Sequence, residues 1–536
     1  MGDSARALEM YDRALPFFEK EGEPLGQANV FQGKGDLYVD LGDYGQALQM
    51  FEKAIFFNEK AENRLGVGNA WLSKGLVYRM TGEYERAMEA LDKALPYFEA
   101  SDHPVGQGYV KLFKGDVYLD RGELQQALQM YDQALPFLVQ AQNLLGLGNV
   151  LLGKGDIYRL KGDYERALTH YHQALPFYEK ESSLMGQGNI WVHQGDTYMD
   201  SGDTERALEM YERALPSFLR IGAMDAVASV TISKARALAA TGKTAAAANL
   251  FETGIEDLER VRRRTRLPDL TRSFTKKVYS NYESAARFLL DHGMGERAFR
   301  VVESMKARGF LDRLAEGRTD LAKGILPELK QKRDRLLRNL DTAAKHLTDE
   351  SSGADAARLE QLREAKRTAE NDLALVEEEI RLKNPLFASV QYPASVTARE
   401  LQQAVLRPGE ALVEYFLAED GCWAFVATRK HFSAIPLKTK KSELEHAVAG
   451  FLKALETRQG VAVAGRRLSD GILRPLERKL PAGSTLWIVP DGVLAQVPFE
   501  ALPAGEKKGV PVHLLESRDL RYIQSATVLA FLRAHG

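Results

Sequence analysis

The sequence is poor in three features that would each point to a class of protein. It contains a single cysteine, Cys422, so it can form neither an internal disulfide nor a cysteine-based zinc site, and this suits a reducing compartment. No run approaches the roughly 18 uninterrupted apolar residues that span a bilayer, and the N-terminus has no apolar signal core. The 72 Lys and Arg nearly balance the 74 Asp and Glu. A net charge of −2 gives no general attraction to nucleic acid or anionic membranes, so we expect the protein to bind neither. The low cysteine content and the missing signal core favour a cytoplasmic protein.

Cofactor-binding motifs are also missing from the sequence. There is no G-x-x-x-x-G-K-[ST] loop and no strand-linked G-x-G-x-x-G, and the Gly-x-Gly pairs belong to repeats in helical context. His431, His446 and His513 show no spacing typical of a metal or catalytic site. We therefore expect no metal, nucleotide or flavin.

What the sequence does contain is an internal repeat. GDLYVDLGDYGQAL begins at 35, related segments begin at 115, 155 and 195, and weaker copies begin at 75 and 235, so every offset is a multiple of 40. The spacing of small and aromatic residues predicts two helices per unit, joined by a turn such as Lys161-Gly162-Asp163. Such units stack side by side, so residues 1–260 are predicted to form a mainly α superhelix with a concave groove.

The repeat resembles the tetratricopeptide repeat, in a longer form with this spacing. Trp71 and Trp191, each four residues before Gly75 or Gly195, complete the signature of the first helix in two units. The resemblance implies an α-solenoid whose first helices line the groove and whose asparagines there hold the backbone of an extended peptide.

Two rows of polar residues follow the repeat. One repeat position holds Asn29, Asn69, Asn149 and Asn189, and the position seven residues later holds Asp36, Asp116, Asp156 and Asp196. Seven residues are two helical turns, so both rows lie on one face of the first helices. Together with the resemblance, this makes them the candidate binding site for a peptide or a partner protein. The alternative is that these side chains only cap or solvate the helix starts.

A third row consists of lysines. It contains Lys34, Lys74, Lys114, Lys154 and Lys234. A basic stripe for an acidic partner is one interpretation. We favour lysine stems that pack along the neighbouring helix with their charged heads in water, and we assign this row no ligand.

The second half of the chain has three predicted parts. Residues 261–320 are typical of a degenerate helical repeat, and the apolar spacing over 321–395 predicts a long helical hairpin. From 396 to 536 short strand-like runs alternate with a helix near 441–457. Strands with intervening helices indicate an α/β domain.

The last part resembles the beginning of a CHAT domain, a caspase-like peptidase module found joined to tetratricopeptide repeats. The resemblance rests on GEALVEYFLAEDGCWAFVATRKHFSAIPL, LWIVPDGVLAQVPFEALP and RYIQSATVL. It implies catalysis by a His and a Cys that end successive strands well beyond the Tyr522–Ala526 segment. We expect the chain from Met1 to Gly536 to lack that pair and to be inactive. Cys422 is interpreted as a packed thiol, and His535 as the continuation of a helix.

These observations predict a protein-interaction scaffold. Its repeats would bind a peptide or partner protein and regulate an attached caspase-like cysteine peptidase module that is incomplete in this chain. The alternative is a scaffold without enzymatic activity. An incomplete sheet leaves an edge uncovered, so self-association through residues 484–536 is also expected.

Overall fold

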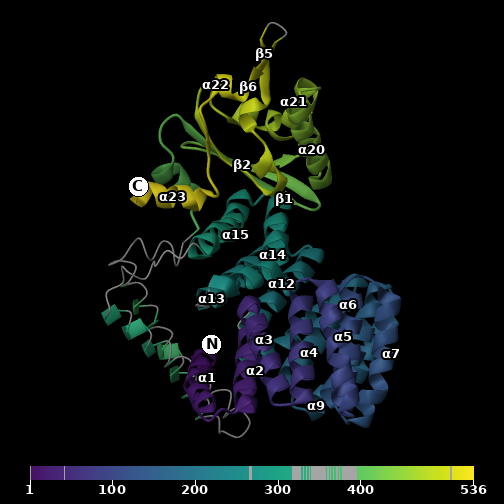
Figure 1. The fold of residues 1–536 in the computed structure, drawn as a ribbon. Helices are drawn as coiled ribbons and strands as arrows, with labels where there is room; N and C mark the ends of the chain where they lie inside the picture. Colours follow the sequence, from purple (N-terminus) through teal and green to yellow (C-terminus); the bar gives the residue numbers. More distant parts are fainter. Residues whose placement is uncertain are drawn as a thin grey trace. The chain divides into compact units, whose positions relative to one another are not determined.

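The computed structural model describes residues 2–40, 43–264, 268–316, 395–507 and 510–535, with scattered positions between 328 and 379. The chain divides into two compact units, and each is described here by itself (Figure 1). The first unit comprises Met1–Lys277 with Leu326–Glu379, and the second comprises Val278–Ile325 with Ile380–Gly536. The helical hairpin predicted for 321–395 lies largely outside the described residues.

The first unit is a stack of antiparallel helix pairs (Figure 1). The first helices of the pairs, called A helices here, are α2 (Pro24–Asp40), α4 (Arg64–Met80), α6 (Pro104–Asp120), α8 (Leu144–Leu160), α10 (Leu184–Asp200) and α12 (Met224–Ala240). The second helices, called B helices, are α1 (Gly2–Lys20), α3 (Tyr44–Lys60), α5 (Tyr84–Ala100), α7 (Leu124–Gln140), α9 (Tyr164–Lys180), α11 (Thr204–Arg220) and α13 (Thr244–Arg264). The predicted mainly α solenoid is confirmed. Helix α14 (Pro268–Asp291) follows it.

The Gly-Asp turns separate the two helices of a pair. Gly162 has a φ of +77°, a left-handed conformation that glycine adopts without steric cost. The next residue, Asp163, caps α9 because its carboxylate accepts a hydrogen bond from the backbone N–H of Arg166. The same residue pair therefore ends one helix and begins the next.

Glycines on the A helices let the B helices approach closely. A Cβ atom on Gly155 would lie 2.3 Å from Cε1 of Tyr171, and one on Gly195 would lie 2.6 Å from Cε1 of Tyr211. Ala167, on the facing side of α9, is fully buried. The repeated glycines are thus required by the close approach of buried aromatic rings.

The A helices form the inner face of the stack. Successive A helices contact one another, as α4 does with α6 and α6 with α8. Successive B helices in the described part of the chain do not contact one another to the same extent. Because the stack curves toward the side where neighbours lie closer, its inner face consists of A helices.

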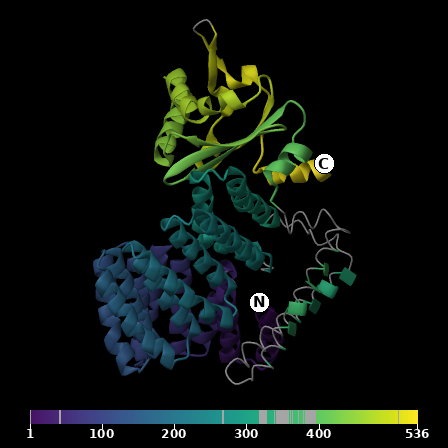
Figure 2. The ribbon, with the colours of Figure 1, turned by 180° about the vertical axis from the view of Figure 1, so that it is seen from behind.

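The second unit is built around a five-stranded sheet with the strand order β3-β2-β1-β4-β7 (Figure 2). Its strands are β1 (Glu410–Ala418), β2 (Gly421–Thr428), β3 (Phe432–Leu437), β4 (Thr485–Val489) and β7 (Leu520–Tyr522), and a separate hairpin contains β5 (Pro503–Lys507) and β6 (Val510–His513). Strands β1, β2 and β3 are antiparallel, whereas β4 is parallel to β1 and to β7. The predicted α/β character of this part is confirmed.

Helices cover both faces of this sheet. They are α15 (Gly295–Glu316), α20 (Lys441–Thr457), α21 (Val461–Ile472) and α23 (Ala526–His535). Short turns of helix lie at α19 (Ala398–Glu400), η2 (Leu401–Val405), η3 (Arg474–Lys479), η4 (Gly492–Gln496), η5 (Phe499–Ala501) and α22 (Leu514–Ser517). Tyr415 of β1 shares one core cluster with Phe451 of α20 and Leu468 of α21. On the other face, the ring of Phe299 in α15 lies 5.4 Å from that of Phe425 in β2.

A buried cluster of charged residues joins α15 to the sheet and to α23. The Glu303 carboxylate is fully buried and accepts hydrogen bonds from the backbone N–H groups of Ala526 at 2.9 Å and Thr527 at 2.5 Å. Lys306 donates to the carbonyl oxygen of Tyr415 and lies 3.4 Å from Glu414. Burial, and then the charge of Glu303, raise the pKa of Glu414 well above its ordinary value. Because unpaired buried charges are costly, this cluster fixes α15 in its place.

Candidate partner-binding site

The asparagine row is exposed at one end and partly buried at the other. Asn29 and Asn69 are exposed on α2 and α4, and no described side chain holds either amide. Asn149 is partly buried, and its Oδ1 accepts a hydrogen bond from the Tyr178 hydroxyl at 2.6 Å. Asn189 is also partly buried. The exposed amides of this row therefore belong to the first two A helices.

Most of the aspartate row holds the helix pairs together. Asp116, Asp156 and Asp196 each accept a hydrogen bond from the hydroxyl of a tyrosine 15 residues later, at 2.6, 2.7 and 2.6 Å. The tyrosines are Tyr131, Tyr171 and Tyr211. Each ring packs against the glycine that precedes the aspartate, so aspartate, glycine and tyrosine form one structural element.

Three repeats lack this element, and in the last of them Arg236 and Phe251 stand at the two positions. Leu76 replaces the aspartate where Leu91 replaces the tyrosine. Asp36 is retained opposite Phe51, which has no hydroxyl group, and Asp36 is exposed. Its carboxylate instead accepts a hydrogen bond from Gln32 at 3.0 Å. Asp36 is thus the one member of the predicted row without a tyrosine partner.

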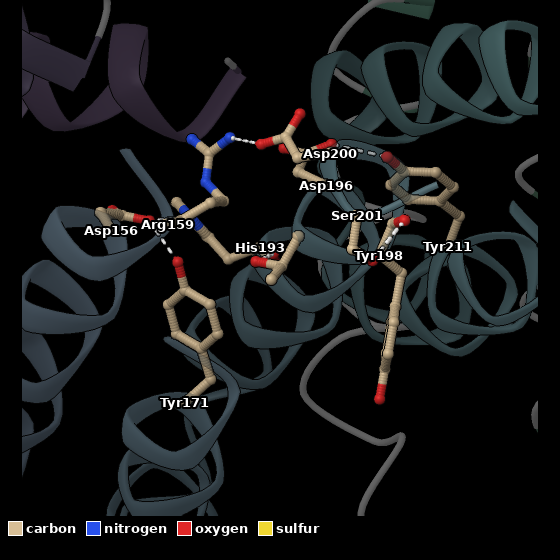
Figure 3. A network of polar contacts seen from close by, with 10 residues as sticks. Asp156, Arg159, Tyr171, His193, Asp196, Tyr198, Asp200, Ser201 and Tyr211 are labelled. Atoms are coloured by element: carbon tan, nitrogen blue, oxygen red, sulfur yellow. Dashed lines mark hydrogen bonds and ion pairs between the residues drawn. The ribbon is translucent and has the colours of Figure 1, made fainter. Parts of the chain in front are cut away.

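Side chains from neighbouring repeats bind two aspartates of this row and two further aspartates that end A helices. Arg79 of α4 donates to Asp116 at 2.6 Å and to Asp120 at 2.7 Å, both on α6. Figure 3 shows the corresponding contacts farther along the stack. There Arg159 donates to Asp200 at 2.8 Å, and Nδ1 of His193 lies 2.7 Å from Asp156. The A helices are therefore linked to one another by charge-assisted hydrogen bonds.

The electrostatics of the inner face differ from repeat to repeat. Burial opposes ionisation of Asp156, but the neighbouring His193 lowers the pKa of Asp156 below its ordinary value. Burial likewise opposes protonation of His193, yet Asp156 raises the pKa of His193. Burial raises the pKa of Asp116 to about 6 despite Arg79. Although the Asp36 side chain is exposed, neighbouring helices partly desolvate its carboxyl group, which raises the pKa of Asp36 to about 6, and the neighbouring Asp40 adds to that shift.

Apolar side chains lie one helical turn before the asparagine row. Leu25, Leu145 and Met185 are 41%, 37% and 45% exposed. An extended peptide needs two kinds of contact. Amide groups of the protein bond its backbone, and apolar residues of the protein contact its side chains. On α2 an exposed apolar side chain, Leu25, lies beside an exposed amide, Asn29. Asn69 adds a second exposed amide on α4.

The lysine row is not a free basic stripe. Each lysine pairs with a carboxylate 22 residues earlier on the B helix of the preceding pair, as Lys74 does with Glu52 at 3.1 Å and Lys154 with Asp132 at 2.5 Å. The other pairs are Lys34 with Asp12, Lys114 with Asp92 and Lys234 with Glu212. The lysine side chains are only 7% to 18% exposed, so their stems pack between helices. This row stabilises the stack.

Sequence reasoning missed Arg79, Arg159 and His193. None of the three recurs at its repeat position in most units, so a search for periodicity passes over them. The tyrosine partners of the aspartates did carry a signal, because each follows the aspartate of a Gly-Asp pair at one constant separation.

Cys422 has the properties of a core residue. Its side chain is 1% exposed in β2, and burial raises the pKa of the thiol to about 11. A thiol that stays protonated near neutral pH is a poor nucleophile. Within the described residues, no helix has the length and apolar character needed to cross a membrane, and no group of three or more potential ligands could hold a metal ion.

Comparison with known proteins identifies both parts of the chain. A model of the MalT-like TPR region matches residues 68–342, a tetratricopeptide repeat model matches residues 28–59, and a CHAT domain model matches residues 463–535. No curated protein matches the chain.

Three solved structures are similar to parts of it. A signal transduction ATPase with numerous domains from Pyrococcus horikoshii, which has a tetratricopeptide repeat sensor, is 16% identical, with 71% of this chain and 55% of that chain covered and a TM-score of 0.37. Aspartyl phosphate phosphatase F from Bacillus subtilis is 13% identical, with 55% and 74% covered and a TM-score of 0.42. The apo form of the quorum sensor NprR from B. thuringiensis is 14% identical, with 57% and 83% covered and a TM-score of 0.43.

The MalT-like TPR model matches more than half of the 536 residues, and the CHAT match falls on the α/β unit. The chain therefore belongs to the MalT-like tetratricopeptide repeat family and carries a C-terminal CHAT domain.

Proposed function

We propose that this protein is an interaction scaffold whose inner face binds an extended peptide or a segment of a partner protein. The observation that carries the proposal is the open amide pair, Asn29 and Asn69, on the first two A helices. Elsewhere on that face Asn149, Asp156 and Asp196 are already bonded within the protein. Binding is therefore expected to centre on α2 and α4 and to use the internally bonded residues as a rigid continuation.

A rigid surface with a few free amides suits peptide binding for a physical reason. An extended peptide presents backbone N–H and C=O groups that lose their water on binding, and each needs a replacement partner. A carboxamide supplies one donor group and one acceptor, so it can bond both groups of one peptide unit. Gln32 lies beside this pair and donates to Ser73 at 3.2 Å, which links α2 to α4.

The finer part of the proposal is that partner binding regulates the CHAT module as part of a caspase-like cysteine peptidase. The CHAT match supports the attachment of such a module. Cys422 does not supply its chemistry, because it is buried and its thiol pKa is raised to about 11. The second candidate is a scaffold that has no enzymatic activity of its own.

The binding proposal can be tested with peptides selected on the full chain from a randomised display library. Affinities of the selected peptides are then compared between the wild type, an Asn29→Ala/Asn69→Ala variant and a Gln125→Ala/Gln126→Ala control. The control removes two exposed amides from α7, a B helix. We expect at least about tenfold weaker binding in the asparagine variant alone, because two hydrogen bonds are lost. Equal affinities in all three proteins would contradict the proposal.

Self-association is a further part of this proposal. Strand β7 forms one edge of the sheet, and Tyr522 on it is 42% exposed. An unpaired strand edge can pair with the same edge of a second molecule. Sedimentation velocity over a range of concentrations should show a dimer if this edge is used, and a monomer throughout would contradict it.

A further inference from the structure

Strand β3 forms the edge of the sheet opposite β7, and one row of its backbone groups faces away from β2. Bonded and non-bonded residue pairs alternate along an antiparallel ladder. Pro436 has no N–H group, so the residues of β3 that bond β2 are the alternate ones, such as Ser433 and Ile435. The backbone bond from Thr428 to the carbonyl oxygen of His431, at 2.8 Å, has the same phase. Residues at the even-numbered positions of β3 therefore turn their N–H and C=O groups away from β2.

These outward groups are open to a further strand. They are the N–H and C=O groups of Phe432 and Ala434 and the carbonyl of Pro436, and none of them bonds another residue that the structure describes. An exposed row of this kind can pair with an added strand. Because Pro436 supplies no donor, the edge can hold only a short segment.

A groove of about 840 Å³ lies beside this row, between β3 and the turn that joins α14 to α15. Trp423, Phe432, Ala434 and Met294 give it apolar walls. The turn approaches the strand closely, because a Cβ atom on Gly295 would lie 2.8 Å from Cβ of Ala434. Side chains of an added strand that share the face of Ala434 would consequently enter the groove.

The rim of the groove is acidic. Asp291 and Glu296 line it and are exposed, and neither carboxylate forms an ion pair within the described part of the chain. Arg297 also lines the groove, and it donates to the sulfur of Met294 at 3.5 Å. Since carboxylates outnumber cations among these lining residues, the groove attracts a ligand with lysine or arginine side chains.

We propose that β3 and this groove bind a basic, extended segment of a partner protein as an additional antiparallel strand. The antiparallel direction follows the pairing of β1, β2 and β3 and gives the slightly more stable ladder. A peptide residue opposite Ala434 then shares its face, so its side chain and those two positions away enter the groove. The segment therefore alternates apolar with polar residues and carries Lys or Arg at its ends. This site lies on the sheet unit and is independent of the amide pair of Asn29 and Asn69, so it gives the protein a second partner class.

The test uses the capped, fluorescently labelled heptapeptide Lys-Thr-Leu-Thr-Leu-Thr-Lys and the full chain. In the antiparallel arrangement the leucines of the peptide turn their backbone groups toward Phe432 and Ala434. Fluorescence anisotropy should show saturable binding. N-methylation of both leucines should weaken it at least about tenfold, whereas N-methylation of two threonines should change it less than about twofold. No saturable binding, equal losses, or a larger loss from the threonine pair would each overturn the proposal.

A protein variant tests the same hydrogen bonds from the other side. Ala434→Pro removes an outward N–H group but no bond to β2, as Pro436 already does, so the variant should fold. It should bind the peptide at least about tenfold more weakly than the wild type does. Thermal unfolding checks its stability, and the methylated peptides decide the question on the wild type if the variant does not fold.

The acidic rim is tested by neutral variants. Asp291→Asn/Glu296→Gln should weaken binding about fivefold at low ionic strength and less in high salt. The control Glu445→Gln/Glu456→Gln removes two exposed carboxylates from α20, on the other face of the sheet, and should bind as the wild type does. An affinity that ignores the loss of Asp291 and Glu296 would overturn the proposal of a basic ligand.

Residue-resolved amide hydrogen exchange shows what covers the edge. In the free chain Phe432 and Ala434 should exchange quickly, Ile435 slowly because it bonds β2, and the peptide should slow the first two alone. Slow exchange of Phe432 and Ala434 in the free chain would overturn the proposal, since the protein itself would then cover the edge. Slowing that grows with protein concentration would overturn it as well, since a second copy would then be the occupant.

Discussion

The two units of this protein use polar bonds in different ways. In the repeats, many bonds join residues at a recurring separation, such as 15 residues for Tyr171 to Asp156 and 22 for Lys154 to Asp132. In the sheet unit, bonds join distant parts of the chain, such as Glu303 to Ala526 over 223 residues and Arg533 to Glu410 over 123. The first pattern spreads stability over many similar contacts, whereas the second concentrates it in a few unique ones.

The largest expected effect tests this concentration in the sheet unit. Glu303→Ala should lower the free energy of unfolding of that unit by about 3–5 kcal/mol, because the buried N–H groups of Ala526 and Thr527 lose their charged acceptor. Urea unfolding monitored by amide exchange in both units measures it. Glu296→Ala is the matched control, since Glu296 is exposed on the same helix. A loss below about 1 kcal/mol would show that this buried cluster contributes little to the stability of the sheet unit.

The next effect concerns close packing in the repeats. Gly155→Ala should destabilise the repeat unit by about 1–3 kcal/mol, since the new Cβ would lie 2.3 Å from the ring of Tyr171. Gly450→Ala is the opposite case in the sheet unit. Its Cβ would meet nothing within 4 Å inside α20, so a gain of about 0.5–1 kcal/mol is expected. Thermal unfolding of both variants measures the change in stability. A change of the same sign in both variants would contradict this expectation.

A smaller effect should depend on pH. The pKa of His193 is raised in the folded protein above the ordinary 6.5, so its bond to Asp156 stabilises fully below that value and less as pH rises through the folded pKa. Asp196 favours and Arg159 opposes this protonation. His193→Asn should therefore cost about 1 kcal/mol near pH 5 and less above pH 8. Urea titrations at several pH values measure the difference, and a cost that grew with pH would refute the assignment.

The smallest effect is expected from a double variant that fills the gap in the lysine row. Where the other repeats pair lysine with an acid, this chain has Gln194 and His172. Gln194 is 1% exposed, and its Nε2 has no hydrogen-bond partner. The double variant His172→Glu/Gln194→Lys should gain about 0.5 kcal/mol in the repeat unit, whereas Gln194→Lys alone should lose stability. A double-mutant cycle by thermal unfolding measures the coupling, and its absence would show that the lysine row contributes nothing.

The sequence predicts the fold of each unit well for different reasons. Gly-Asp turns and apolar spacing recur at the same place in each repeat, so one recognised unit such as α8 with α9 predicts the others. In the sheet unit, a short and almost continuous apolar run predicts the buried strand β1, and local spacing predicts α20. The bond from Glu303 to α23 could not be predicted in this way, because no local pattern relates residues 223 apart.

In the candidate site, too, the sequence predicts which positions recur but not which neighbours their side chains contact. Periodicity identifies the rows that contain Asn69 and Asp116, because both recur on one helix face. It does not distinguish an amide open to a ligand from a carboxylate bonded to Tyr131 and Arg79. That distinction depends on which neighbour reaches the side chain, and Arg79 lies on another helix, 37 residues away.

The arginine bonds between A helices have a consequence for how such a protein can lengthen. Arg79 and Arg159 stand two repeats apart, as do Asp40, Asp120 and Asp200, while Met80 and Leu160 occupy the alternate helix ends. Donor and acceptor helices therefore alternate along the stack as far as α10. Duplication of a single repeat would place two like helices side by side, whereas duplication of two repeats would preserve every arginine bond. A double repeat, and not a single one, is thus the smallest unit that could be added to this part of the stack with all of its arginine bonds kept.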